Sequence, residues 1–301
     1  MLILRGPAGQ VRKIVFCSTG TALVAAIDNG IAFFRTLDRS KPQKIDQYCY
    51  ADMEIADADR TLFLPEHGGL RSIDLATGAV RKFRLATTRM ARIAGTRDAR
   101  QFVIGQPSDP KNLGYVSLRS CSDPASPVWH QALDRSWIKR VLLHEGRDEV
   151  HCMVQNGHPF PTEFWFETFS LSTGKEIRRS DLLAEEHDDD GVLSPDGEWL
   201  ATFRMTRISV YPTSTAFTQP TIVKNTGRPS YTSIAYHPSG RFLAATSNDT
   251  TVKLYDTATW QLARTYSWNI GRLRSIAFSP DGLLAAAGSD TGRIMVWDVD
   301  E

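Results

Sequence analysis

Two stretches near the end of the chain share one pattern, and this repeat constrains the fold more than any other feature. Residues 231–256 read YTSIAYHPSGRFLAATSNDTTVKLYD, and residues 273–298 read LRSIAFSPDGLLAAAGSDTGRIMVWD. Each copy holds an apolar alternating segment, a four-residue turn, a segment of small residues, a polar turn and a final apolar segment. Short segments rich in Ile, Val and aromatic residues, bounded by Gly, Asp and Ser, are typical of β-strands. The repeat therefore predicts antiparallel strands joined by tight turns.

The four-residue turn has the chemistry of a hairpin connection. In the copy at residues 279–282, Pro280 presets the φ angle of the second position, and Gly282 accepts a positive φ at the last. The turn can be followed upstream with decreasing similarity, and its copies lie about 40 to 50 residues apart, close to the period of four-stranded propeller blades. Its last position falls at Gly20, Asp59, Ala99, Gly146, Gly197, Gly240 and Gly282. The spacing predicts seven units.

The third strand of each unit is expected at residues 31–35, 70–75, 115–118, 165–171, 208–211, 252–255 and 294–297. The last unit ends directly after its third strand, whereas residues 1–5 precede the first strand of the first unit. We therefore expect residues 2–5 to supply the missing fourth strand, which removes open sheet edges. The prediction is an all-β, seven-bladed β-propeller of four-stranded antiparallel blades, closed by the N-terminal strand as the outer strand of the last blade. It is expected to form a single domain over residues 1–301.

These motifs resemble the WD-repeat (WD40) family. The resemblance is carried by SPDG at residues 279–282 and 194–197, by VWD at residues 296–298 and by LYD at residues 254–256. It is strong over the last third of the chain, fair in the first and fifth units, and weak in the second to fourth units. The resemblance implies a scaffold for protein–protein interactions. It also implies that partners bind the top face, which is formed by the turns between second and third strands and by the links between blades.

The chain departs from the family in the side chains that stiffen each blade. Family members often join a His, a Ser or Thr, an Asp and the Trp of the third strand in a hydrogen-bonded tetrad. In the last unit Trp297 is present, but Asn269, Ala287 and Thr291 stand at the other three positions. We therefore expect stability to depend on strand packing and on ring closure.

Charge and composition exclude several other classes of protein. The chain has 35 basic and 34 acidic residues, so no overall field attracts nucleic acid or anionic lipid. No run of 18 apolar residues and no signal-peptide core is present, so we expect a cytoplasmic protein without membrane contact. The four cysteines are scattered without a C-x-x-C pair, which favours reduced thiols over a zinc or redox site.

The search for catalytic and metal-binding motifs is negative. The sequence holds no G-x-S-x-G, H-E-x-x-H, G-x-x-x-x-G-K-[ST] or G-x-G-x-x-G, and its seven histidines are isolated. We therefore expect no catalytic residue, no metal ligand, no cofactor and no enzymatic activity. One alternative is an enzyme, or a binder of small molecules or metals, that uses the central channel.

Three features single out candidate contact regions. An acidic run at residues 185–190 falls on the link from the fourth to the fifth blade. A basic segment at residues 71–100 carries eight Lys and Arg residues, which gives a second alternative, nucleic-acid binding. The turn at residues 156–163 is lengthened and carries Phe160 between two prolines, an aromatic anchor of the kind that forms binding hot spots.

Most candidates for partner binding come from these three regions, and Arg207 is added from the fifth unit. We expect a chain that is monomeric by itself and that binds protein partners of unknown identity, whereas nucleic acid is not favoured. The candidate residues are Arg89, Arg92, Phe160, Glu185, Glu186, Asp188, Asp189 and Arg207.

Overall fold

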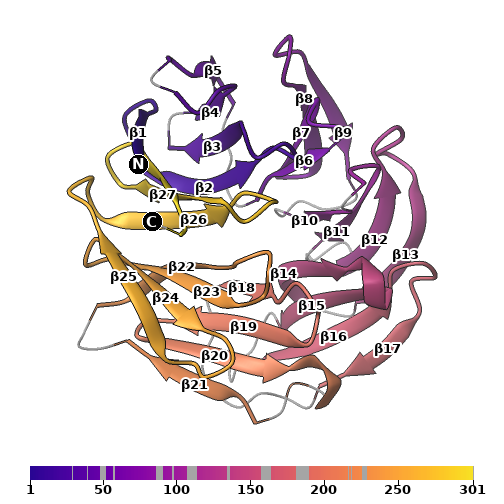
Figure 1. The fold of residues 1–301 in the computed structure, drawn as a ribbon. Coiled ribbons are helices and arrows are strands. Elements are labelled where there is room, and N and C mark those ends of the chain that lie inside the picture. The colour runs from indigo at the N-terminus through magenta and orange to yellow at the C-terminus, as the bar shows by residue number, and fades with distance from the viewer. Residues whose placement is uncertain are drawn as a thin grey trace. The chain divides into compact units, whose positions relative to one another are not determined.

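A computed structural model describes most of the chain. The described residues are 1–28, 30–38, 40–47, 52–56, 58–85, 91–96, 98–106, 114–133, 136–156, 164–180, 190–215, 217, 219–225 and 229–300. Their strands form seven four-stranded sheets, and all the strand pairs recorded in these sheets are antiparallel (Figure 1). The fold is the all-β, seven-bladed β-propeller that the spacing of the turns predicts.

Two compact units organise the chain. The first comprises residues 1–49, 188–211 and 220–301, and the second comprises residues 50–187 and 212–219. The prediction of one domain over residues 1–301 stays a prediction. We number the blades one to seven in chain order and name the strands of each blade a to d, with a at one sheet edge and d at the other.

The first unit contains four blades. Blade one has β2 (Val11–Phe16), β3 (Leu23–Ile27), β4 (Gly30–Phe34) and β5 (Gln43–Ile45). Blade five has β18 (Asp190–Leu193), β19 (Trp199–Arg204), β20 (Arg207–Pro212) and β21 (Thr221–Lys224). Blade six has β22 (Tyr231–Tyr236), β23 (Phe242–Ser247), β24 (Thr251–Asp256) and β25 (Leu262–Ser267). Blade seven has β26 (Leu273–Phe278), β27 (Leu284–Ser289), β28 (Arg293–Asp298) and β1 (Leu2–Arg5).

The second unit contains three blades. Blade two has β6 (Glu54–Ala56), β7 (Thr61–Glu66), β8 (Gly69–Asp74) and β9 (Val80–Arg84). Blade three has β10 (Arg92–Gly95), β11 (Gln101–Gln106), β12 (Gly114–Ser120) and β13 (Pro127–Leu133). Blade four has β14 (Ser136–His144), β15 (Glu149–Asn156), β16 (Phe164–Ser170) and β17 (Glu176–Arg179). Two short 3-10 helices, η1 (Glu145–Arg147) and η2 (Thr213–Thr215), lie in connections.

Blades pack in chain order within each unit through their a strands. In the first unit β26 lies against β2 and β22, and β22 lies against β18. In the second unit β10 lies against β6 and β14. Apolar clusters lie between neighbouring blades, and one in the first unit holds Ile14, Phe34, Ala286 and Val296 from blades one and seven. The third strands predicted from the sequence are confirmed in all seven blades as β4, β8, β12, β16, β20, β24 and β28.

The N-terminal strand completes blade seven, as the sequence predicts. Strand β1 pairs antiparallel with β28, from Leu2 opposite Val296 to Arg5 opposite Arg293. The backbone of Gly6 extends the contact, because its N–H donates to the carbonyl of Gly292 at 3.0 Å. Leu4 is buried in the cluster shared by blades one and seven, whereas Ile3 on the same strand is 44% exposed.

The a–b turns have the predicted backbone, with one correction. Gly20, Gly197, Gly240 and Gly282 all have positive φ angles, and Asp59 and Ala99 adopt the same conformation at the equivalent position of blades two and three. In blade four the predicted position, Gly146, lies inside η1, and the left-handed residue is Asp148 with a φ of 55°. The turn is longer in blade four because a 3-10 turn precedes the left-handed residue. The His144 side chain stabilises this 3-10 turn by accepting a hydrogen bond from the backbone N–H of Arg147.

Other side-chain pairs replace the family's tetrad. In blade six the hydroxyls of Tyr231 and Tyr255 lie 2.6 Å apart, and Lys253 donates to the Asn225 carbonyl oxygen at 2.5 Å. In blade seven the Thr291 hydroxyl donates to the carbonyl of Ile270 at 2.6 Å. The tyrosine pair joins strand c to strand a, and the other two bonds tie strand c or the b–c turn to the link before strand a.

The tryptophans of blades four and five differ in exposure. Trp165 is buried, whereas Trp137 and Trp199 are each 38% exposed. Trp199 is the first residue of its b strand and Trp137 the second residue of its a strand, so each lies near a strand end, where neighbouring strands cover the ring less.

Truncation of Leu4 tests the role of the N-terminal strand. We expect Leu4→Ala to lower the free energy of unfolding by about 3 kcal/mol, because it opens a cavity in the cluster shared by blades one and seven. The neighbouring Ile3→Ala is the matched control, and its cost is expected below about 1 kcal/mol because Ile3 is exposed. Urea unfolding of both variants measures the difference, and equal costs would contradict the packing of β1 described above.

Candidate functional site

The structure describes two of the eight predicted partner-binding residues. Arg92 and Arg207 lie in described strands. The remaining six, together with most of the long turns of blades three and four, lie outside the described residues: Arg89, Phe160, Glu185, Glu186, Asp188 and Asp189.

Arg92 joins two neighbouring blades. It is half-buried at the start of β10, and its Nε donates a hydrogen bond to the carbonyl of Lys139 in β14 at 2.7 Å. Arg140 follows Lys139 in β14, and its Nη1 lies 3.0 and 3.1 Å from the two carboxylate oxygens of the fully buried Asp52. Charged side chains on or just before the a strands therefore join the three blades of the second unit. A contact between Arg92 and a partner stays a prediction.

Arg207 follows an exposed apolar side chain that the sequence analysis did not single out. Met205 occupies the b–c turn of blade five, where it is 61% exposed and has a φ of 46°. Arg204 and Arg207 flank it, and Lys224 lies opposite Arg207 in the pairing of β20 with β21. An apolar side chain is thus displayed among three basic residues at one end of blade five.

Hydrogen bonds fix the backbone of the turns in the first unit. In blade one the carboxylate of Asp28 accepts a hydrogen bond from the backbone N–H of Gln10 at 2.9 Å. In blade six the Asn248 side chain accepts one from Ser230, and in blade seven the Asp290 side chain accepts one from Arg272, each at 3.1 Å. Each pair ties a b–c turn to the link that precedes the same blade, so the backbone at this end is held before any partner binds.

The basic side chains of residues 71–100 lie in different environments. Arg71 forms an ion pair with Glu66, and both side chains are largely buried. Arg81, Lys82 and Arg84 lie on the outer strand β9, where all three are exposed. Arg89 and Arg97 lie outside the described residues.

A buried polar network in blade four surrounds the carboxylate of Glu149. Glu149 Oε1 lies 2.8 Å from Arg178 Nη2, and Glu149 Oε2 lies 3.3 Å from Nε2 of the fully buried His151. Nδ1 of His151 lies 3.0 Å from the Thr168 hydroxyl. The ring of Phe217 packs edge-on against the His151 imidazole. Because protein surrounds the imidazole, we interpret this network as structural.

Metal-ligand clusters, cysteine pairing and membrane-spanning helices were searched for within the described residues. These residues contain no group of three or more His, Cys, Asp and Glu side chains arranged to hold a metal. Cys17, Cys121 and Cys152 are not in disulfide bonds, and Cys49 lies outside the described residues. No helix within the described ranges has the length and apolar character needed to cross a membrane.

Comparison with known proteins agrees with the repeat. The family described as "WD domain, G-beta repeat" matches residues 223–256 and 260–298, which cover blade six and most of blade seven. The chain is 25% identical over 149 residues to the target of rapamycin complex subunit wat1 of Schizosaccharomyces pombe, a match that covers 50% of this chain and 46% of that protein.

Two shorter matches involve other repeat proteins. An uncharacterised WD-repeat-containing protein of Synechocystis is 30% identical over 94 residues, which is 31% of this chain and 26% of that protein. The human serine-threonine kinase receptor-associated protein is 34% identical over 65 residues, which is 22% of this chain and 19% of that protein. The matches therefore span less than half the length of each of these relatives.

Acid is expected to destabilise the fold through the network in blade four. Burial lowers the pKa of His151 below its ordinary 6.5. Burial opposes ionisation of Glu149, but its interactions with His151 and Arg178 prevail and lower the pKa of that carboxyl from 4.5 to about 2. The unfolded chain therefore takes up a proton at His151 below about pH 6.5, and at Glu149 below about pH 4.5, before the folded chain does. Each group removes up to about 1.4 kcal/mol of stability per pH unit inside its window.

Urea unfolding between pH 7 and pH 5 measures this effect. We expect His151→Gln to flatten the fall of stability below pH 6.5, because glutamine does not titrate. The control is His130→Gln, which changes an exposed histidine and is expected to leave the slope as it is. An unchanged slope in His151→Gln would show that the buried imidazole takes up its proton in the folded state.

Proposed function

We propose that this chain, which belongs to the WD-repeat (WD40) family, is a non-catalytic platform that binds protein partners through its top face. The named relatives support the proposal: one is a subunit of the target of rapamycin complex, and another is associated with a serine-threonine kinase receptor. In the same proposal the chain is monomeric by itself and acts in the cytoplasm.

The observation that carries the proposal is the b–c turn of blade five. Met205 is among the most exposed large apolar side chains in the described residues. It stands on a turn whose backbone is engaged, because the carbonyl of Met205 accepts a hydrogen bond from the N–H of Tyr231 at 2.6 Å. Methionine adapts to different apolar surfaces and is frequent at binding surfaces. The basic residues around it favour an acidic partner through complementary charge.

The candidates predicted from the sequence are further contact residues in the proposal. Arg207 is part of the blade-five turn itself, and Arg92 lies at the start of strand a in blade three. The acidic residues Glu185, Glu186, Asp188 and Asp189 precede blade five in the chain, and Arg89 precedes blade three. Phe160, in the long b–c turn of blade four, is the proposed aromatic anchor.

Neither alternative function has a specific observation in its favour. In the basic segment, Arg71 is largely buried and forms an ion pair with Glu66, so part of the segment's charge is neutralised within the protein. No set of residues in the described a strands combines a nucleophile, a base and a group that orients the base.

Crosslinking at position 205 tests the platform. We expect a photoreactive residue at position 205 to capture a discrete protein partner from lysate of the source organism, and Arg207→Glu to reduce that capture about tenfold through charge reversal. The matched control carries the same photoreactive residue at position 283, because Leu283 is 57% exposed and lies in the a–b turn, at the other end of its blade. Equal capture at both positions, or capture insensitive to Arg207→Glu, would contradict the proposal.

A further inference from the structure

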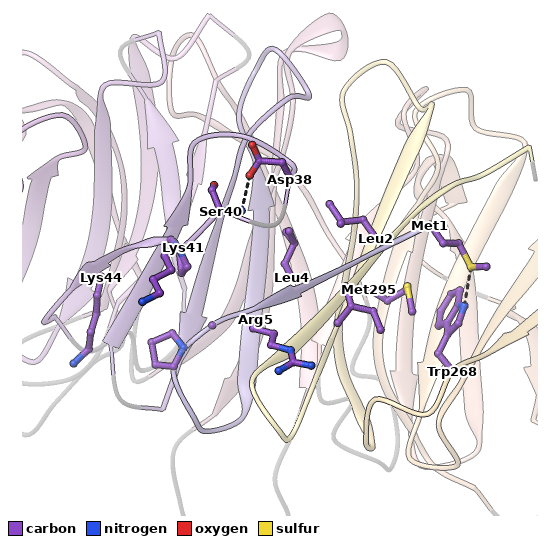
Figure 2. A pocket seen from close by; sticks show the side chains of 14 residues that line it. Met1, Leu2, Leu4, Arg5, Asp38, Ser40, Lys41, Lys44, Trp268 and Met295 are labelled. Carbon is purple, nitrogen blue, oxygen red and sulfur yellow. Dashed lines mark hydrogen bonds between the residues drawn. The ribbon is translucent and has the colours of Figure 1, made fainter.

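A groove runs along the outer edge of blade seven, away from the top-face turn of blade five. It has a volume of about 980 Å³ and lies between β1 and the connection from β4 to β5 in blade one, all within the first unit (Figure 2). Its wall includes the seven consecutive residues 1–7, and the other contributors are Asp38, Ser40, Lys41, Pro42, Lys44, Trp268 and Met295.

The groove follows the free edge of the sheet. Consecutive side chains of a strand point to opposite faces, so a groove that touches every residue of β1 must run along the strand's backbone. Strand β1 is the outermost strand of its sheet, with β28 as its neighbour on the inner side. Its outward N–H and C=O groups therefore line the groove. Such an edge can accept an added strand through main-chain hydrogen bonds.

One end of the groove is apolar and built on stacked rings. The Trp268 indole stacks on Tyr266 at an angle of 10° and also packs on Trp297, with ring centroids 4.6 Å apart. The indole N–H donates to the sulfur of Met1 at 3.3 Å (Figure 2). With the exposed Ile3, these residues form an apolar wall that is already assembled in the free chain.

The other end of the groove is basic. Figure 2 shows Arg5, Lys41 and Lys44 on the side away from Trp268. Lys44 forms an ion pair with Asp46 at 2.8 Å, whereas Arg5 and Lys41 are exposed and have no ion pair among the described residues. The acidic residue of the lining, Asp38, is engaged within its own loop by the N–H of Ser40 and the hydroxyl of Thr36. Arg5 and Lys41 outnumber the carboxylate of Asp38, so the net charge at this end is positive.

We propose that this groove binds a short extended segment of a protein partner that pairs with the edge of β1 and carries acidic residues beside apolar ones. The strand edge selects an extended backbone, the ring-lined end selects apolar side chains, and Arg5 and Lys41 select carboxylates. A segment of about four to six residues spans the strand, since an extended chain rises about 3.3 Å per residue. This second docking surface is independent of the top face.

Binding of a defined peptide tests the groove. The probe is a capped, fluorescein-labelled hexapeptide of three leucines followed by three glutamates, titrated by fluorescence polarisation against the full chain with any tag at its C-terminal end, because Met1 lines the groove. We expect saturable binding that Arg5→Glu and Lys41→Glu each weaken about fivefold or more. Arg81→Glu is the matched control, because Arg81 is exposed on the outer strand of blade two, and it is expected to leave binding unchanged.

Further measurements test whether an acidic peptide or a second copy of the chain occupies the groove. Lysine in place of glutamate in the peptide, or methylation of alternate peptide amides, is expected to abolish binding. Hydrogen exchange of the unmodified chain is expected to slow at residues 1–7 and 40–44 on peptide addition, a readout that needs no variant. Absence of binding, or equal binding of the glutamate and lysine peptides, would overturn the proposal. A concentration-dependent dimer that Arg5→Glu dissociates would also overturn it, because the groove would then hold a second copy of the chain.

The top-face proposal can fail separately. Its variants at positions 205 and 207 leave the groove residues unchanged, and the peptide experiment uses no partner from lysate. Loss of peptide binding in Arg5→Glu with normal crosslinking at position 205 would assign the two surfaces to different ligands, as proposed.

Discussion

The pairing of β1 with β28 is the constraint on which the organisation of the first unit depends. It joins the two ends of the chain in one sheet and places Leu4 in the apolar cluster between blades one and seven. The same strand leaves its outer backbone edge and the side chains of Ile3 and Arg5 exposed. One short strand therefore completes a core on one side and forms the wall of the proposed peptide groove on the other.

Hydrogen bonds between turns and links stiffen the blades in place of the tetrad that WD-repeat proteins often have. Asp28, Asn248 and Asp290 tie b–c turns to the links before their own blades, and Lys253 binds Asn225 from within blade six. A turn backbone that is fixed before binding loses less conformational entropy when a partner docks. A turn backbone fixed by hydrogen bonds can present exposed side chains such as Met205 to a partner in a defined position.

Much of the fold could be predicted from the sequence because its signals are local. The turn glycines report a positive φ, and alternating apolar residues report strands, so seven blades and all seven third strands follow from the pattern alone. The prediction that Gly146 takes the left-handed position is wrong because the His144 side chain stabilises an additional 3-10 turn, a contact that cannot be predicted from the residue types. Of the residues in the proposed blade-five surface, Arg207 is a candidate from the sequence, a prediction that stays untested. Met205 is not singled out by the sequence because an isolated methionine in a turn has no pattern of its own.

The sequence by itself determined the number of blades, the strand order within them and the use of the N-terminal residues as the last outer strand, because these depend on periodicity and on one missing strand. Only the tertiary structure decided what each exposed side chain faces. Arg92 is directed to a neighbouring blade's carbonyl, Met205 to the surface, and Met1 to the Trp268 ring. These outcomes depend on which blades lie side by side and how their strands twist, and contacts between residues distant in the chain leave no local signal in the sequence.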